Sequence, residues 1–161
     1  MQRKKIAIAV TGASGSIYAR QLIQKLSQRN DIELALVFSK NAKDVWKYEL
    51  GNEEYTDLSP KQYSIDDYFA PFASGSSSFE ALVICPCSMG TLSGIACGSS
   101  DTLITRCADV CLKEKRRLIL VPRETPLSLI QLRNMVAASE AGAVILPACP
   151  AFYSQPKSLA E

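Results

Sequence analysis

The residues best suited to chemistry stand in short polar turns that each follow an apolar run. The longest such stretch covers residues 83–98, VICPCSMGTLSGIACG, where an apolar run meets the polar turn 87–91 and then a helical pattern at 92–97. Serine and threonine hydroxyls and several unpaired backbone N–H groups therefore meet at a helix N-terminus. Because the helix dipole favours negative charge at the same place, the turn predicts a binding site for an anion such as phosphate.

Four other polar positions follow apolar runs in the same way: the glycine-rich turn 11–15 (TGASG), Ser39, the pair Arg123 and Glu124, and Tyr153. An arginine at a strand end can grip a phosphate through its planar fork, and a neighbouring glutamate can transfer a proton. A plain surface ion pair is the alternative for Arg123 and Glu124. Tyr153 follows two prolines and is therefore held stiffly, either at a site or as a core or interface tyrosine.

The turn 11–15 also resembles the opening of a short-chain dehydrogenase. Residues 153–157 have the letters of that family's Tyr-x-x-x-Lys motif, but a proline inside a helix, here Pro156, costs about 3 kcal/mol. The apolar run 32–38 ends in Ser39 and not in an acid that would bind ribose hydroxyls. We therefore reject this class, and a plain tight turn remains the other interpretation of residues 11–15.

The numbers and positions of cysteine and histidine exclude several kinds of catalytic site and argue against a metal site. The six cysteines lie inside apolar segments, no CxxC pair exists, and histidine is absent. Catalysis by Ser-His-Asp or Cys-His groups is therefore excluded, and no metal site is expected. Buried, reduced cysteines in a cytoplasmic protein are the expected arrangement.

The length and net charge of the chain restrict its domain organisation and its possible partners. At 161 residues with a net charge of +2, the chain fits one domain, residues 1–161, and nothing favours nucleic acid as a partner. No apolar run reaches the roughly 18 residues of a membrane span, so no membrane partner is expected. The short apolar segment after the N-terminal basic residues predicts a first strand and no signal peptide. The basic cluster 113–117 is a solvated helix end, an anion site or an interface.

Apolar periodicity predicts the elements that hold the turns in place. We expect strands at 5–10, 32–38, 81–85, 117–121 and 143–146, and helices at 17–28, 42–50, 92–97, 102–115 and 127–141. This alternation predicts an α/β fold, a three-layer Rossmann-like (flavodoxin-like) parallel sheet with helices on both faces. Ligands of such sheets bind beyond the carboxyl ends of the strands, so the polar turns meet at one edge and favour a phosphorylated ligand.

Residues 51–78 lack the regular strand and helix patterns of the rest of the chain and contain prolines, tyrosines and the run SGSSS. We expect a long connection, functional or mobile, that includes a short strand or helical turn. A linker between two domains is the alternative.

Five stretches together resemble the flavin prenyltransferase family (the UbiX/Pad1 type): GASGSIYA at 12–19, Ser39-Lys40 after the second expected strand, ICPCSMGTLSGIACG at 84–98, the stretch 105–135 with LVPRETPLS, and GAVILPACPAFYSQP at 142–156. The resemblance covers nearly the whole chain. It implies an enzyme that joins the dimethylallyl group of dimethylallyl phosphate to N5 and C6 of reduced FMN. The prenylated FMN then serves a UbiD-type decarboxylase. The family needs no metal and assembles as homo-oligomers, typically dodecamers, with sites near subunit contacts.

The resemblance also implies residue roles. The expected cofactor-binding residues are Gly12, Ala13, Ser14, Ser39 (at the phosphate), Ser88, Met89, Gly90, Thr91 and Arg123. Tyr153, Arg106 and Lys113 are expected to bind the prenyl phosphate. Ser14 and Glu49 are expected to handle a proton, although a lone helix glutamate such as Glu49 is more often solvated. Glu124 is expected to protonate the departing phosphate.

The sequence departs from the pattern of the flavin prenyltransferase family at two places, and two other functions compete with prenyl transfer. Gln131 stands where many relatives have histidine, and relatives continue beyond the position of Glu161 with a helix that carries a further basic residue. We expect FMN binding to persist without that helix. A related FMN-dependent cysteine decarboxylase is the first competitor, but it relies on a catalytic histidine. The second is an FMN-binding or carrier protein without transferase activity.

Overall fold

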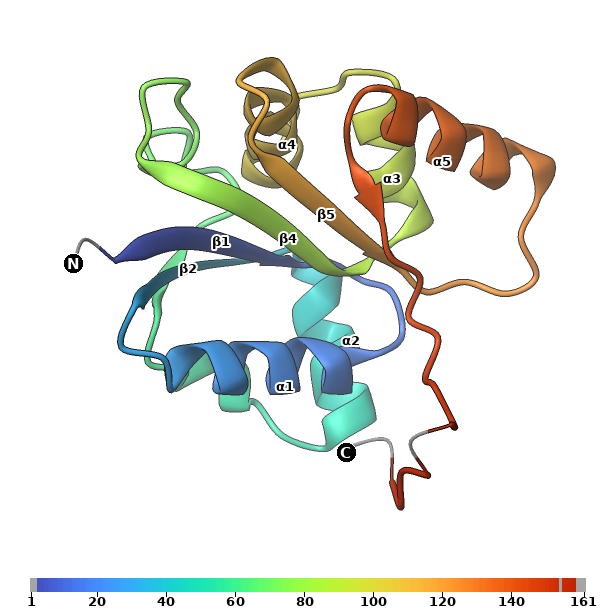
Figure 1. Cartoon of the computed structure of the whole chain (residues 1–161). Coiled ribbons are helices and arrows are strands. Elements are labelled where there is room, and N and C mark those ends of the chain that lie inside the picture. The colour runs from blue at the N-terminus through green and yellow to red at the C-terminus, as the bar shows by residue number, and fades with distance from the viewer. Residues whose placement is uncertain (1–2, 154, 159–161) are drawn as a thin grey trace.

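A six-stranded sheet forms the middle layer of the protein (Figure 1). The computed structural model describes residues 3–153 and 155–158, so both ends of the expected domain 1–161 lie outside the described residues. The strands are β1 (Lys4–Val10), β2 (Ile32–Phe38), β3 (Lys61–Tyr63), β4 (Phe79–Cys87), β5 (Arg117–Pro122) and β6 (Val144–Ile145). They run in the order β3-β2-β1-β4-β5-β6, and every neighbouring pair is parallel.

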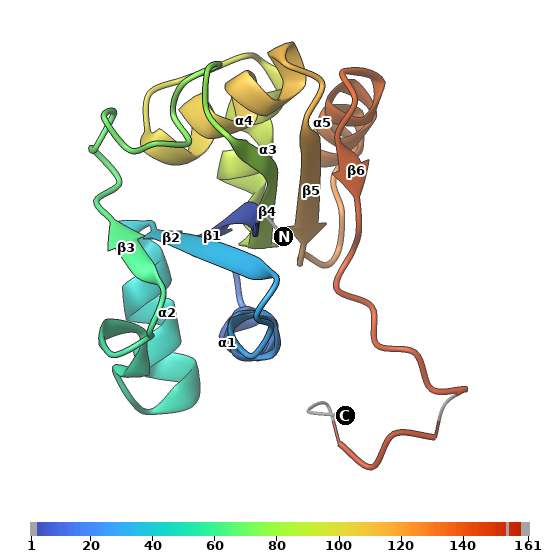
Figure 2. The same ribbon diagram turned by 60° about the vertical axis from the view of Figure 1, so that its left-hand side comes forward.

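Helices cover both faces of this sheet (Figure 2). The elements α1 (Ser16–Ser27) and α2 (Lys40–Leu50) lie on one face, and α3 (Met89–Ala96), α4 (Leu103–Lys113) and α5 (Leu129–Glu140) lie on the other. Two apolar cores result because successive strand residues point to opposite faces. In β1, Ile8 and Val10 pack towards α1 and α2, whereas Ala7 and Ala9 belong to the other core. The predicted fold class is confirmed.

Capping residues set where the helices begin. Ser39 accepts a hydrogen bond from the Ala42 backbone N–H at 3.1 Å, so α2 begins at Lys40 and not at residue 42. Ser88 caps α3 in the same way through the Thr91 N–H, which makes the polar turn shorter than predicted and places Met89, Gly90 and Thr91 in the first helical turn. A serine cap satisfies a backbone donor that would otherwise lack a partner.

The connection 51–78 packs against the sheet. It contains the 3-10 turn η1 (Glu54–Thr56) and the short edge strand β3, as expected. Ala70 and Phe72 are buried in the core with α3 and α4, and the Leu103 N–H donates to the Ile65 carbonyl oxygen. The segment therefore belongs to one of the two cores of the sheet, and the alternative of a linker is wrong.

The strand order reverses between β1 and β4, because the chain winds one way through β2 and β3 and the other way through β5 and β6. The loops that leave β1 and β4 consequently separate above the carboxyl edge and open a crevice there. Within the part of the chain that the structure describes, no helix is long and apolar enough to cross a bilayer.

Candidate flavin site

A pocket of about 440 Å³ lies at this reversal point. Its lining comes from the carboxyl ends of β1, β2 and β4: Gly12, Ser39, Lys40, Asn41, Ser88, Gly90 and Thr91. Five of these seven residues were predicted to bind the cofactor. Lys40 and Asn41 were missed, although their place directly after a capping serine is the signal that identifies the first turn of a helix.

Two helix N-termini face this pocket, which gives it the character of an anion site. The first residues of α2 and α3 present backbone N–H groups without helical partners, next to the hydroxyls of Ser39 and Ser88. Lys40 adds a full positive charge. Gly12 allows the close approach of the β1 loop to α2, since a Cβ at that position would lie 2.6 Å from the Asn41 Cβ. These donors fit a phosphate monoester.

Glu49 closes the N-terminus of α1 from the neighbouring helix α2. Its carboxylate accepts hydrogen bonds from the Gly15 N–H at 3.0 Å and the Ser16 N–H at 2.8 Å. Partial burial acts to raise the pKa of Glu49, but hydrogen bonds from the Ser14 side chain and from the backbone of Ser16 and Gly15 outweigh it and hold the pKa below its ordinary value. Glu49 is exposed to solvent, as expected of a helix glutamate, but its carboxylate is also hydrogen-bonded to the start of α1 and to Ser14.

This cap makes a pH-dependent contribution to stability. Because the pKa of Glu49 is lower in the folded protein, its stabilisation is present above the unfolded value, about 4.3, and is lost as the pH falls through the folded value. We expect E49Q to lose ~1 kcal/mol of unfolding free energy at pH 7. That difference disappears in acid. Urea unfolding at several pH values measures it, with D44N on the exposed side of α2 as control, and a pH-independent difference would contradict the assignment.

Arg123 and Glu124 follow β5 at the same edge and are exposed. Among the described residues no ion pair within 4 Å joins them, and the Glu124 carboxylate accepts from the Thr125 N–H at 2.9 Å. The alternative of a surface ion pair is therefore wrong. The segment after β6 runs beside the end of β5, since the Ala148 N–H donates to the Pro122 carbonyl oxygen at 3.0 Å. Tyr153 lies further along this segment and is 93% exposed, which excludes a core tyrosine.

Arg106 and Lys113 lie elsewhere, on α4, and line no part of the pocket. The Arg106 guanidinium donates to the Ala73 carbonyl oxygen and lies 3.6 Å from the Asp109 carboxylate. Lys113 pairs with Glu114 at 3.2 Å. Within one chain, these two cations therefore do not reach the pocket that five of the predicted cofactor-binding residues line.

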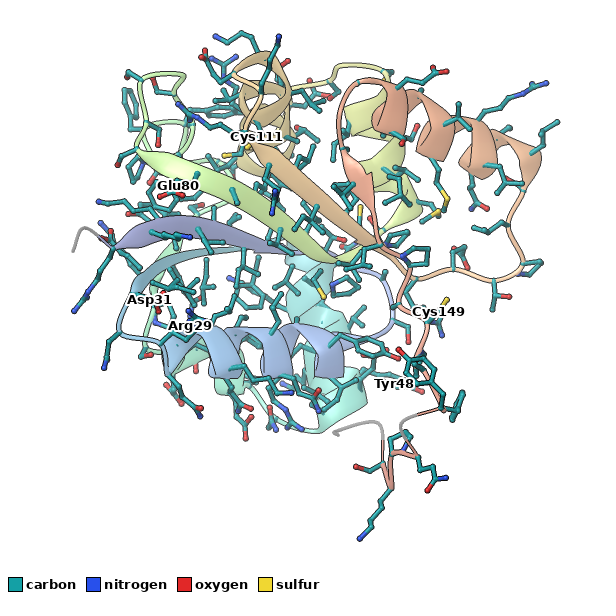
Figure 3. The ribbon with its side chains drawn as sticks, viewed as in Figure 1. Arg29, Asp31, Tyr48, Glu80, Cys111 and Cys149 are labelled. Carbon is teal, nitrogen blue, oxygen red and sulfur yellow. The ribbon has the colours of Figure 1, made fainter. Side chains whose placement is uncertain are left out.

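The cysteines belong mainly to the core. Cys85, Cys87, Cys107 and Cys111 are buried, and burial raises the pKa of the Cys85 and Cys111 thiols to about 11. Cys97 and Cys149 are exposed, contrary to the prediction, and Figure 3 shows Cys149 on the extended segment after β6. All six are free thiols. Within the described ranges no group of three or more Cys, Asp or Glu residues is placed to hold a metal ion.

Sequence comparison identifies the family. The family model described as Flavoprotein matches residues 1–156. The flavin prenyltransferase UbiX of Methanocaldococcus jannaschii is 46% identical over 157 residues, which cover 96% of this chain and 84% of that protein. The flavin prenyltransferase LpdB of Lactiplantibacillus plantarum is 46% identical over 98% of this chain and 86% of its own length. The chain belongs to the flavin prenyltransferase family.

Two solved structures share the fold over nearly the whole of this chain. AnUbiX (PadA1), crystallised with FMN and dimethylallyl pyrophosphate, superposes with a TM-score of 0.92 at 44% identity, over 98% of this chain and 85% of that chain. A dodecameric FMN-dependent UbiX-like decarboxylase from Escherichia coli O157:H7 gives 0.92 at 40% identity, over 96% and 85%. The cysteine decarboxylases SpaF and EpiD, at 17% and 20% identity, share the fold alone.

Proposed function

We propose that this chain transfers a dimethylallyl group from dimethylallyl phosphate to N5 and C6 of reduced FMN. The observation that carries the proposal is the pocket at the reversal point of the sheet, where two helix N-termini and the hydroxyls of Ser39 and Ser88 converge. Its near full-length relatives are flavin prenyltransferases. Reduced FMN would supply the nucleophilic atoms N5 and C6.

The cofactor-binding residues divide by their place around the pocket. Ser39, Lys40 and the first turns of α2 and α3 would hold the FMN phosphate. The other proposed flavin contacts come from the loops after β1, β4 and β5, where Gly12, Ala13, Ser14, Ser88 and Arg123 lie, and from Met89, Gly90 and Thr91 in the first turn of α3. Ser14, hydrogen-bonded to Glu49, would take up the proton released at C6, with Glu49 as its acceptor.

Departure of the phosphate from the dimethylallyl group requires cations and a proton donor. Breaking the allylic C–O bond develops positive charge on the prenyl carbon and negative charge on the leaving phosphate. Fixed cations at that phosphate lower the barrier, and we assign this role to Arg106 and Lys113. Tyr153 would donate a hydrogen bond to the phosphate, and Glu124 would protonate it as it leaves.

The partners follow from the same proposal. We propose that the chain assembles as a homo-oligomer, a dodecamer as in the E. coli relative, and that the prenylated FMN passes to a UbiD-type decarboxylase. A cytoplasmic location fits the six free thiols, since reducing compartments keep thiols unpaired.

Mass analysis of the flavin tests the proposed transfer. The purified protein is incubated anaerobically with reduced FMN and dimethylallyl phosphate, and the mass of the released flavin is measured. A gain of one prenyl unit supports the transferase. Unchanged FMN that stays bound to the protein favours the FMN-binding protein without transferase activity. Absence of bound flavin would contradict the assignment of the pocket.

Lys40 provides a direct test of the phosphate pocket. We expect K40A to weaken FMN binding by about tenfold, because it removes the charge nearest the two helix N-termini. Quenching of flavin fluorescence measures the dissociation constant. K43A, on the same helix but outside the pocket, is the matched control and should bind FMN as the native protein does. Equal losses in both variants would show a general charge effect and no phosphate contact.

A further inference from the structure

The side chain of Thr11 joins the loops after β1 and β4, both of which contribute residues to the pocket lining. Thr11 is the first residue after β1 and is only 2% exposed. Its hydroxyl donates to the Pro86 carbonyl oxygen at 2.7 Å and accepts from the Ser88 backbone N–H at 2.7 Å. Both partners stand at the end of β4, so one hydroxyl links the β1 loop to the β4 loop.

The backbone makes only a long hydrogen bond between these two loops. The ladder between β1 and β4 ends at the pair Ala9 and Ile84, and Pro86 has no N–H group to donate. Beyond the ladder, the Thr11 N–H reaches the Pro86 carbonyl oxygen at 3.3 Å. The hydroxyl supplies two shorter bonds, each of 2.7 Å. It therefore strengthens the connection between the two loops beyond the end of the ladder.

Thr11 does not line the pocket, so any effect on a ligand passes through its neighbours. Ser88, whose N–H it holds, is the N-cap of α3 and one wall of the pocket. Gly12, the next residue along the chain, also lines the pocket. We infer that Thr11 is a positioning residue that fixes the spacing of the FMN phosphate pocket. The inference rests on the proposed FMN site.

The hydroxyl is the part of the side chain that matters. Thr11→Val keeps the shape but leaves the partly buried Ser88 N–H without its acceptor and takes one donor from the buried Pro86 carbonyl oxygen. Thr11→Ser keeps both bonds. Thr105 is the matched control, because it is also a buried threonine with a hydrogen-bonded hydroxyl, at the start of α4 and outside the pocket.

The test compares FMN with riboflavin, which has the same ring system and no phosphate. Dissociation constants come from fluorescence quenching, and the melting temperature of each variant without flavin reports folding. We expect the preference of T11V for FMN over riboflavin to be about tenfold smaller than that of the native protein. The preference of T11S should stay within about twofold of the native value. T105V should have a lower melting temperature and an unchanged preference for FMN. T11A is the second variant without a hydroxyl if T11V does not fold.

Two outcomes would overturn the inference: an unchanged preference for FMN in a folded T11V or T11A, or an equal loss in T105V. Failure of the proposed function gives a different result. If the native protein itself does not prefer FMN over riboflavin, the phosphate pocket is wrong. If the native protein prefers FMN and T11V does too, the pocket stands and only the role of Thr11 fails.

Discussion

Replacing Glu124 with glutamine is expected to lower the rate of prenyl transfer by about 100-fold or more, the usual effect of removing a general acid. Glu124 follows β5 at the carboxyl edge, on the same side of the sheet as the proposed FMN site. No lysine or arginine among the described residues lies within 4 Å of its carboxylate, so no ion pair holds it in place. Its carboxyl group is thus exposed and free to contact a ligand at this edge of the sheet.

The measurement separates this role from flavin binding. E124Q should bind FMN with a dissociation constant within about twofold of the native value, because glutamine has nearly the same shape and lies outside the phosphate pocket. Prenylated FMN formed per minute is then compared with that of E140Q, an exposed glutamate at the end of α5. Unchanged turnover in E124Q would remove Glu124 from the mechanism.

The sequence predicts the sheet well because its strands are buried on both faces. Continuous apolar runs such as residues 34–38 and 118–121 have few alternatives in a chain of this length. The ends of elements were less predictable. The helices α2 and α3 begin at Lys40 and at Met89-Gly90, whose helical state depends on the capping bonds of Ser39 and Ser88 and not on apolar spacing.

The site was predictable as far as parallel topology places strand ends together. That rule brought Gly12, Ser39 and Ser88 to one pocket. It could not show that Glu49 reaches back from α2 to the start of α1, because this contact depends on how two helices pack. It could not predict that Arg106 lies away from this pocket, because the position of α4 depends on how the helices pack on the sheet.

The position of Arg106 leads to the second large prediction. Its guanidinium contacts the Ala73 carbonyl oxygen and Asp109 on α4, away from the strand-end pocket of its own chain. If it binds the prenyl phosphate as proposed, it must do so in the site of a neighbouring copy. We expect R106A to lower prenyl transfer by about 100-fold, because a fixed cation at the leaving phosphate is lost. FMN binding should be unchanged.

Mixed oligomers distinguish sites shared between subunits from sites within one chain. R106A and E124Q are each expected to be nearly inactive. When the two are unfolded, mixed in equal amounts and reassembled, a shared site takes Glu124 from one copy and Arg106 from another, so about a quarter of the sites regain both native residues. Activity should rise to a comparable fraction of the native rate. A mixture no more active than its parents would place both residues in the site of one chain and contradict the shared arrangement.

The control mixture replaces R106A with K115A, which changes a basic residue just beyond the end of α4. The mixture of K115A with E124Q should show only the activity of the native Glu124 sites.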